Sequence, residues 1–165
     1  MNEEIIKLMT NISLLLQIKG ESYFKFSAYS NAAEVIKRDN LDIKQLVTDG
    51  KISEIKGFGK ALSEKITEFT LNGNLKYYDN LTKEVPEGLI DFLKVEGLGP
   101  KKVLQIYLET GISTLEMLSE ACDNGRIESL KGFTVSSAGK IKNSIEQIIN
   151  NADYKSRKID FDQIQ

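Results

Sequence analysis

A short pattern, glycine–apolar–glycine, occurs twice in this chain, and a variant of it occurs a third time. Each copy stands just before a stretch whose apolar residues recur at helical spacing. The first glycines of the three copies lie 40 and then 35 residues apart, and this unequal spacing predicts separately placed units instead of a stacked solenoid. The copies are Gly57-Phe58-Gly59, Gly97-Leu98-Gly99 and Gly132-Phe133-Thr134.

Each copy has the properties of an anion-binding turn. Glycine has no Cβ atom, so the backbone can take a positive φ and another molecule can approach it closely. The turn directs backbone N–H groups outward, and the following helix adds unsatisfied N–H groups and the positive end of its dipole. The apolar residue between the small residues is expected to anchor the hairpin in its core. Such turns bind phosphate, and phosphate contacts do not read base sequence.

Lysines flank all three copies, although the chain as a whole has a net charge of −2. If the phosphate belongs to DNA, its contacts should therefore be confined to the lysine-flanked turns, and the binding affinity should fall as the salt concentration rises. The third copy has Thr134 in place of the second glycine. We interpret it as a packing element, with a third DNA clamp as the alternative. The flanking residues are Lys56 and Lys60; Lys94, Lys101 and Lys102; and Lys131 and Lys140.

The composition restricts the chemistry that is open to the chain. It contains no histidine and a single cysteine, Cys122, which excludes His-dependent nucleophile systems, an internal disulfide and nearly every zinc site. Catalysis would have to use lysine, tyrosine or carboxylates. No apolar run is long enough to span a bilayer, and the acidic start of the chain shows no export signal. We expect a cytoplasmic protein without a membrane partner.

The apolar periodicity predicts helices almost throughout and no sheet. Helices are expected at 3–18 and 22–38, followed by a short helix capped by Asp42. The predicted fold class is all-α, with two small helical domains built around tandem helix-hairpin-helix motifs. The segment 82–88, which contains Pro86, is the expected boundary. It separates a first domain at 1–82 from a second at 86–150, and a tail or linker follows at 151–165.

Three motifs in order resemble the N-terminal region of family X DNA polymerases of the polymerase β type, especially the bacterial form. They lie at Phe26–Ala33, Ile55–Ile66 and Val95–Pro100, and the resemblance covers about residues 4–150. It implies a lyase-type domain that binds the 5′-phosphate side of a gap, followed by a subdomain that holds the primer duplex. The chain ends before the family's catalytic palm, so we expect no polymerase activity from it alone. Asp160 and Asp162 are interpreted as a coincidental Asp-x-Asp.

By this resemblance, Lys65 matches the lysine that forms a Schiff base with C1′ of a 5′-deoxyribose phosphate before β-elimination. That chemistry requires an unprotonated amine. Lys25, Tyr29 and Lys60 would then surround the 5′-phosphate. The alternative is a solvated, non-catalytic Lys65, because the chain departs from the lyase-active members at Phe24, Ala61 and Tyr77.

The resemblance also implies Na⁺ or K⁺ at the hairpins, held by backbone carbonyls; no cofactor is otherwise required. By position, these carbonyls belong to Ser53, Ile55 and Phe58, and to Leu93, Val95 and Leu98. The expected DNA contacts are made by Gly57, Gly59, Lys60, Gly97, Gly99, Lys101 and Lys102, together with Lys25 and Tyr29.

Three functions stay open at this point. The first is sequence-independent binding of gapped or nicked double-stranded DNA, as the DNA-binding part of a repair polymerase of the base excision repair type. The second is a 5′-deoxyribose-phosphate lyase, and the third is a protein-interaction scaffold that reuses the hairpin fold. Further partners would be a polymerase palm domain or other repair proteins.

Overall fold

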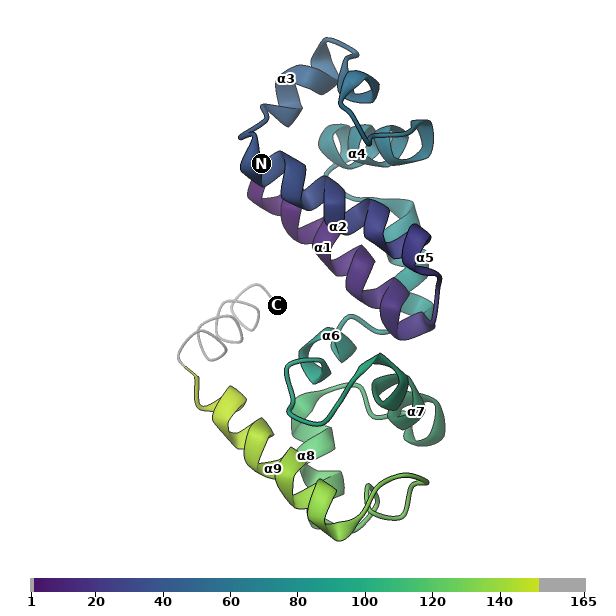
Figure 1. Ribbon diagram of the computed structural model, residues 1–165, viewed down its shortest axis with the longest axis vertical. Coiled ribbons are helices and arrows are strands. Elements are labelled where there is room, and N and C mark those ends of the chain that lie inside the picture. Colours follow the sequence, from purple (N-terminus) through teal and green to yellow (C-terminus); the bar gives the residue numbers. More distant parts are fainter. Residues whose placement is uncertain (1, 152–165) are drawn as a thin grey trace. The chain divides into compact units, whose positions relative to one another are not determined.

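The computed structural model describes residues 2–151, which contain nine α-helices, one 3-10 helix and no strand. The prediction of an all-α fold is confirmed. The chain forms two compact units that divide between Glu87 and Gly88 (Figure 1). The expected tail, from residue 152 on, lies outside the described residues, and so do Asp160 and Asp162. In the described part of the chain, no helix has the length and apolar character needed to cross a membrane.

The first unit is built on two long helices, α1 (Asn2–Lys19) and α2 (Tyr23–Arg38), which lie side by side (Figure 1). Their apolar faces form much of the core of this unit, and the small side chains of Ala32 and Ala33 on α2 are buried. Ser22 caps α2, because its hydroxyl accepts the N–H of Lys25. The sequence therefore sets both the length and the buried face of this pair.

The rest of the first unit carries the first glycine hairpin. A short helix, α3 (Ile43–Thr48), begins after the predicted cap Asp42, whose carboxylate accepts the N–H of Gln45 at 3.1 Å. The 3-10 helix η1 (Ile52–Glu54), α4 (Lys60–Asn72) and α5 (Lys76–Glu84) follow. The C-terminal end of α4 is set by Gly73, which has a φ of 78° and donates its N–H to Phe69.

Helix α5 ends at Glu84, inside the predicted boundary segment 82–88, and the two units divide later in the same segment. The buried side chains of Leu81 and Val85 continue its apolar face across the expected domain end at residue 82. Burial of this face holds the turn 82–84 in helical form, and the two units divide after it. The composition of residues 82–84 did not reveal this last helical turn, because Thr, Lys and Glu are compatible with a helix and with a linker.

The second unit consists of α6 (Leu89–Phe92), α7 (Pro100–Thr110), α8 (Leu115–Asp123) and α9 (Val135–Ile149). Its core is formed by fully or almost fully buried apolar residues from all four helices: Leu89, Phe92, Val103, Ile106, Leu118, Ile141 and Ile145. At the start of the unit, a Cβ on Gly88 would lie 2.2 Å from the Ser113 carbonyl oxygen. A side chain at that position would therefore push the chain away from the loop that precedes α8.

Candidate nucleic-acid interface

The three hairpins share one backbone conformation. The first glycine of each has a positive φ, of 91°, 90° and 87° in chain order, which side-chain-bearing residues rarely adopt. In each turn, the N–H of the apolar residue donates to the carbonyl three residues earlier, as a type II turn requires. These bonds are Phe58 to Ile55 at 3.0 Å, Leu98 to Val95 at 3.1 Å, and Phe133 to Leu130 at 3.1 Å.

The apolar residue of each hairpin lies in the core. Phe58, Leu98 and Phe133 have exposed fractions of 4%, 6% and 6%. The expectation that these side chains anchor the turns is confirmed. Because the side chain is buried, the backbone of each turn faces outward, and the glycines beside it are exposed.

The second small residue of each hairpin differs from the first glycine in its backbone conformation. Gly59, Gly99 and Thr134 have φ values of −70°, −101° and −135°, and each is the N-cap of the helix that follows. Any residue can adopt these values. A Cβ on Gly59 or Gly99 would also meet no atom within 4 Å. The fold does not require glycine here, so the missing side chain serves to leave the helix N-terminus open.

The N-termini of α4 and α7 carry no side-chain cap, whereas that of α9 is capped twice. The N–H of Ser137 donates to the Thr134 hydroxyl at 3.1 Å, and the N–H of Thr134 donates to the Ser137 hydroxyl at 2.8 Å. This capping box uses N–H groups that an anion would otherwise bind. The first two hairpins are thus suited to bind a phosphate, and the third is closed by its own side chains.

Some lysines near the turns interact with an acid or an aromatic ring, and others form no ion pair. Lys94 pairs with Asp91 at 3.6 Å, and the Lys102 ammonium lies 5.2 Å from the centre of the Phe133 ring. Of the lysines that flank the hairpins, all of them within the described residues 2–151, five are exposed and form no ion pair: Lys56, Lys60, Lys101, Lys131 and Lys140. The second turn also contains an exposed acid, Glu96, where the other two turns have lysine. The first hairpin therefore has the more positive surroundings.

The second and third hairpins hold each other in place inside the second unit. The N–H of Glu96 donates to the buried Ser144 hydroxyl on α9 at 2.9 Å. In return, the Gln105 side chain on α7 donates to the Lys131 carbonyl at 2.9 Å. Together with the contact of Lys102 on Phe133, these bonds give the third hairpin a supporting role for the second.

The carbonyls expected to hold a monovalent cation differ in the hydrogen bonds that they already accept. In the first hairpin, Ile55 accepts the turn N–H, and Phe58 accepts the Ser63 hydroxyl at 3.4 Å. No backbone N–H of the described residues donates to Ser53, Phe58, Leu93 or Leu98. The same residues 2–151 hold no cluster of three His, Cys, Asp or Glu side chains around a metal site.

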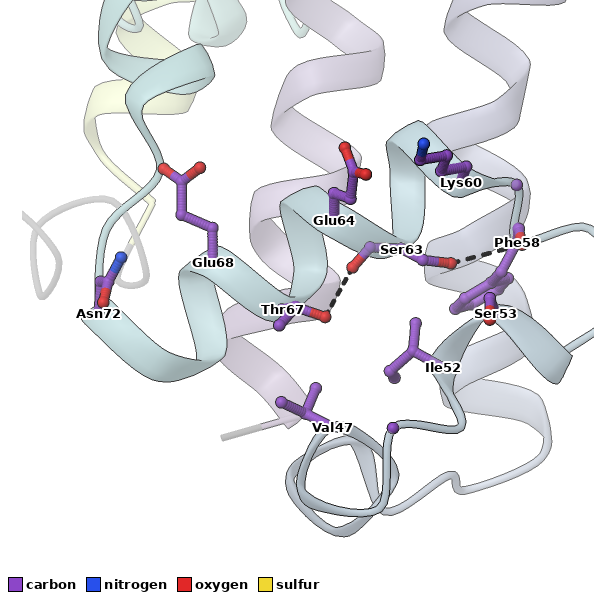
Figure 2. A pocket seen from close by; sticks show the side chains of 12 residues that line it. Val47, Ile52, Ser53, Phe58, Lys60, Ser63, Glu64, Thr67, Glu68 and Asn72 are labelled. Carbon is purple, nitrogen blue, oxygen red and sulfur yellow. Dashed lines mark hydrogen bonds between the residues drawn. The ribbon is translucent and has the colours of Figure 1, made fainter.

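A cavity of about 780 Å³ lies beside the first hairpin, between α3, η1 and α4 (Figure 2). Val47, Ile52 and Phe58 give it apolar walls. Glu64 and Glu68 follow Lys60 along α4, as Figure 2 shows. These acids disfavour a polyanion along the length of the cavity. Only the end at Gly59 and Lys60 combines open N–H groups with positive charge.

The predicted lyase residues are brought together in part. The Lys65 ammonium lies 4.6 Å from the centre of the Tyr77 ring, and this ring stacks on Tyr29 with centroids 6.2 Å apart. Burial, with a smaller contribution from Tyr77, raises the pKa of the Tyr29 phenol above its ordinary value. Lys25, by contrast, pairs with Glu21 at 3.4 Å.

The positions that depart from the lyase-active pattern have different surroundings. Phe24 is 87% exposed, and Ala61 is also exposed, so neither replaces a buried contact. Tyr77 is the exception, because it connects Lys65 to Tyr29. In the sequence, Tyr77 only indicates that a basic residue of the lyase-active pattern is missing. Its contact with Lys65 depends on how α4 and α5 pack together, and helical periodicity does not predict that packing.

Comparison with known proteins agrees with the hairpin geometry. A helix-hairpin-helix domain family matches residues 1–75, and a SAM-like helix-hairpin-helix tandem family matches residues 89–147. The DNA polymerase/3′-5′ exonuclease PolX of Bacillus subtilis (strain 168) is 36% identical over 139 residues. The match covers 84% of this chain and 24% of the relative, so the chain spans about a quarter of that protein's length. The predicted resemblance is confirmed.

Proposed function

We propose that this chain, which belongs to the helix-hairpin-helix proteins and is similar over most of its length to the N-terminal part of a family X DNA polymerase, binds gapped or nicked double-stranded DNA. It would bind through backbone phosphates, as the DNA-binding part of a repair polymerase. The observation that carries the proposal is the pair of uncapped helix N-termini behind Gly59 and Gly99, each beside an unpaired lysine.

In the proposed complex, a phosphate lies against the N–H groups that begin α4 or α7. Lys60 and Lys101 would add charge-assisted hydrogen bonds to its oxygens. Na⁺ or K⁺ at the hairpin carbonyls would add a positive charge beside the phosphate. These contacts involve only the backbone of DNA, so affinity would be independent of base sequence.

A preference for gaps would follow from the division of the chain. Each unit carries one open hairpin, so each would hold a separate duplex segment. A gap or nick offers two such segments joined by a flexible strand, whereas intact duplex is stiff over this length. The first unit would bind the 5′-phosphate side, where the resemblance places Lys25, Tyr29 and Lys60.

Fluorescence anisotropy with gapped, nicked and intact duplexes tests this proposal. About four phosphate contacts would give a slope near −3.6 for log affinity against log salt. Affinity should then fall on the order of 100-fold between 50 and 200 mM salt, with the gapped duplex bound most tightly. Affinity that does not change with salt, or no binding to gapped DNA, would refute the proposal.

One observation favours a second function, a 5′-deoxyribose-phosphate lyase. Lys65 and Tyr29, which the resemblance assigns to one site, are connected by Tyr77. In the proposed reaction, the Lys65 nitrogen attacks C1′ of the open sugar, water leaves, and β-elimination releases the sugar from the 3′ phosphate. Borohydride should trap the imine on incised abasic DNA, and Lys65→Ala should abolish trapping while Lys83→Ala does not. Trapping that survives Lys65→Ala would assign another nucleophile.

A further inference from the structure

Three side chains from three helices of the first unit form a stack. Tyr29 on α2 is 8% exposed, and the Tyr77 ring from α5 lies on it at an interplanar angle of 12°. The Lys65 ammonium from α4 then lies 4.6 Å above the Tyr77 ring centre. Because Tyr29 is fixed in the core, it supports the Tyr77 ring, and this ring in turn offers its face to Lys65.

The ring face attracts the ammonium electrostatically and also occupies one side of the nitrogen. To form a Schiff base, the nitrogen must lose a proton and turn its lone pair toward a carbonyl carbon. Both steps require Lys65 to give up its contact with the ring. An exposed lysine without such a contact, such as Lys83 on α5, has no comparable restraint.

We propose that Tyr77 is a positioning residue that holds the Lys65 ammonium against its ring and makes this amine a slow Schiff-base nucleophile. The inference deepens the second function proposed above. Its test needs no DNA, so a failure of DNA binding and a failure of this inference give different results. It also gives the departure at Tyr77 a definite role: it restrains the nucleophile.

Reductive methylation with formaldehyde and cyanoborohydride measures the reactivity of each amine. The lysine nitrogen attacks the aldehyde carbon, the oxygen leaves as water, and cyanoborohydride delivers hydride to the imine carbon. Peptide mass spectrometry of the full chain then gives the rate at Lys65 relative to Lys83 in the same sample. In the wild-type chain, we expect Lys65 to react about two- to fivefold more slowly.

Three variants separate the effect of the ring from other effects. Tyr77→Leu removes the ring and should bring the Lys65-to-Lys83 ratio close to one. Tyr77→Phe keeps the ring face and should leave the ratio at its wild-type value. Tyr107→Leu removes a half-buried tyrosine from the second unit as a matched control, and should also leave it unchanged.

Two results would overturn the inference: a ratio that Tyr77→Leu does not change, or an equal increase in Tyr77→Phe and Tyr77→Leu. Thermal unfolding shows whether each variant is folded. If Tyr77→Leu does not fold, the wild-type ratio decides, since methylation of Lys65 as fast as that of Lys83 would also contradict a restrained amine.

Discussion

Gly57 and Gly59 stand two residues apart in one turn, yet their backbone conformations differ. Gly57 has a φ of 91°, whereas Gly59 has a φ of −70° and open space around its missing Cβ. Substitution of the first glycine should therefore affect folding, and substitution of the second should affect whatever approaches the turn. The same division applies to Gly97 and Gly99.

Alanine at each position of the first hairpin tests this division. Gly57→Ala should destabilise the first unit by about 1–2 kcal/mol, because it forces a side chain into the left-handed region. Gly59→Ala should lower the unfolding free energy by only about 0.5 kcal/mol, because alanine is a weaker N-cap than glycine. It should also weaken DNA binding, because its Cβ meets only the ligand. Thermal unfolding and anisotropy measure the two effects. Equal loss of stability in both variants would contradict the account.

Glu96 brings a negative charge close to the second proposed phosphate site. Glu96→Gln should strengthen DNA binding by about two- to fivefold at low salt, since one repulsive charge of this kind costs roughly 0.5–1 kcal/mol. Glu109→Gln is the matched control, because Glu109 is also exposed but lies at the far end of α7, the helix that follows the second hairpin. If the control variant gains as much affinity, the effect is one of net charge and not of position.

One buried phenol, Tyr29, and one half-buried phenol, Tyr78, predict how stability depends on pH. Burial raises the pKa of Tyr29 and of Tyr78, and a hydrogen bond to Glu87 adds to the rise at Tyr78. Each phenol ionises more easily in the unfolded chain, so the stability it contributes is complete below about pH 10 and falls as the pH rises above that value. Thermal unfolding at pH 8 and pH 11 should show the loss, and Tyr29→Phe should reduce it.

At the scale of elements, the three hairpins show what sequence reasoning could and could not supply. The glycine pattern predicted all three turns, and the buried apolar residues confirm their orientation. The bracing of the second hairpin by Ser144 joins residues 48 positions apart, so no local pattern reveals it. The Tyr77 contact was missed for the same reason, since helix periodicity predicts a buried face but not its partner.

The closure of the third hairpin was within reach of the sequence. Thr134 and Ser137 have the spacing of a capping box, although serine replaces the usual Glu or Gln at the second position. The structure shows both bonds, which supports the interpretation of this copy as a packing element. The interpretation itself remains a prediction until DNA contacts are measured.

Opening the third hairpin tests that interpretation. Thr134→Gly removes the cap and leaves the N–H groups of α9 free, next to the exposed Lys131 and Lys140. We expect a loss of stability below about 1 kcal/mol and an increase in DNA affinity. Thr134→Ala also removes the cap but keeps a Cβ at the N-terminus, so it should gain less. An equal gain in both variants would mean that open space at this position is unimportant.

At the scale of the whole molecule, we infer that an acidic chain can bind DNA through two local sites, where lysines and open N–H groups lie together. Unpaired lysines and uncapped helix N-termini coincide at the first and second hairpins, whereas acids line the adjoining cavity. Each compact unit contributes one open hairpin. Tight binding to gapped DNA should therefore require both hairpins at once, since two linked contacts raise the effective affinity.

The most direct test compares the wild-type chain with Gly59→Ala, Gly99→Ala and the double variant, using a gapped duplex at low salt. Each single variant should weaken binding, and the double variant should bind gapped and intact duplex equally poorly. All four chains should remain folded, because each change of an N-cap glycine to alanine costs only about 0.5 kcal/mol. Wild-type affinity in the folded double variant would contradict the central claim that the two open hairpins hold the DNA backbone.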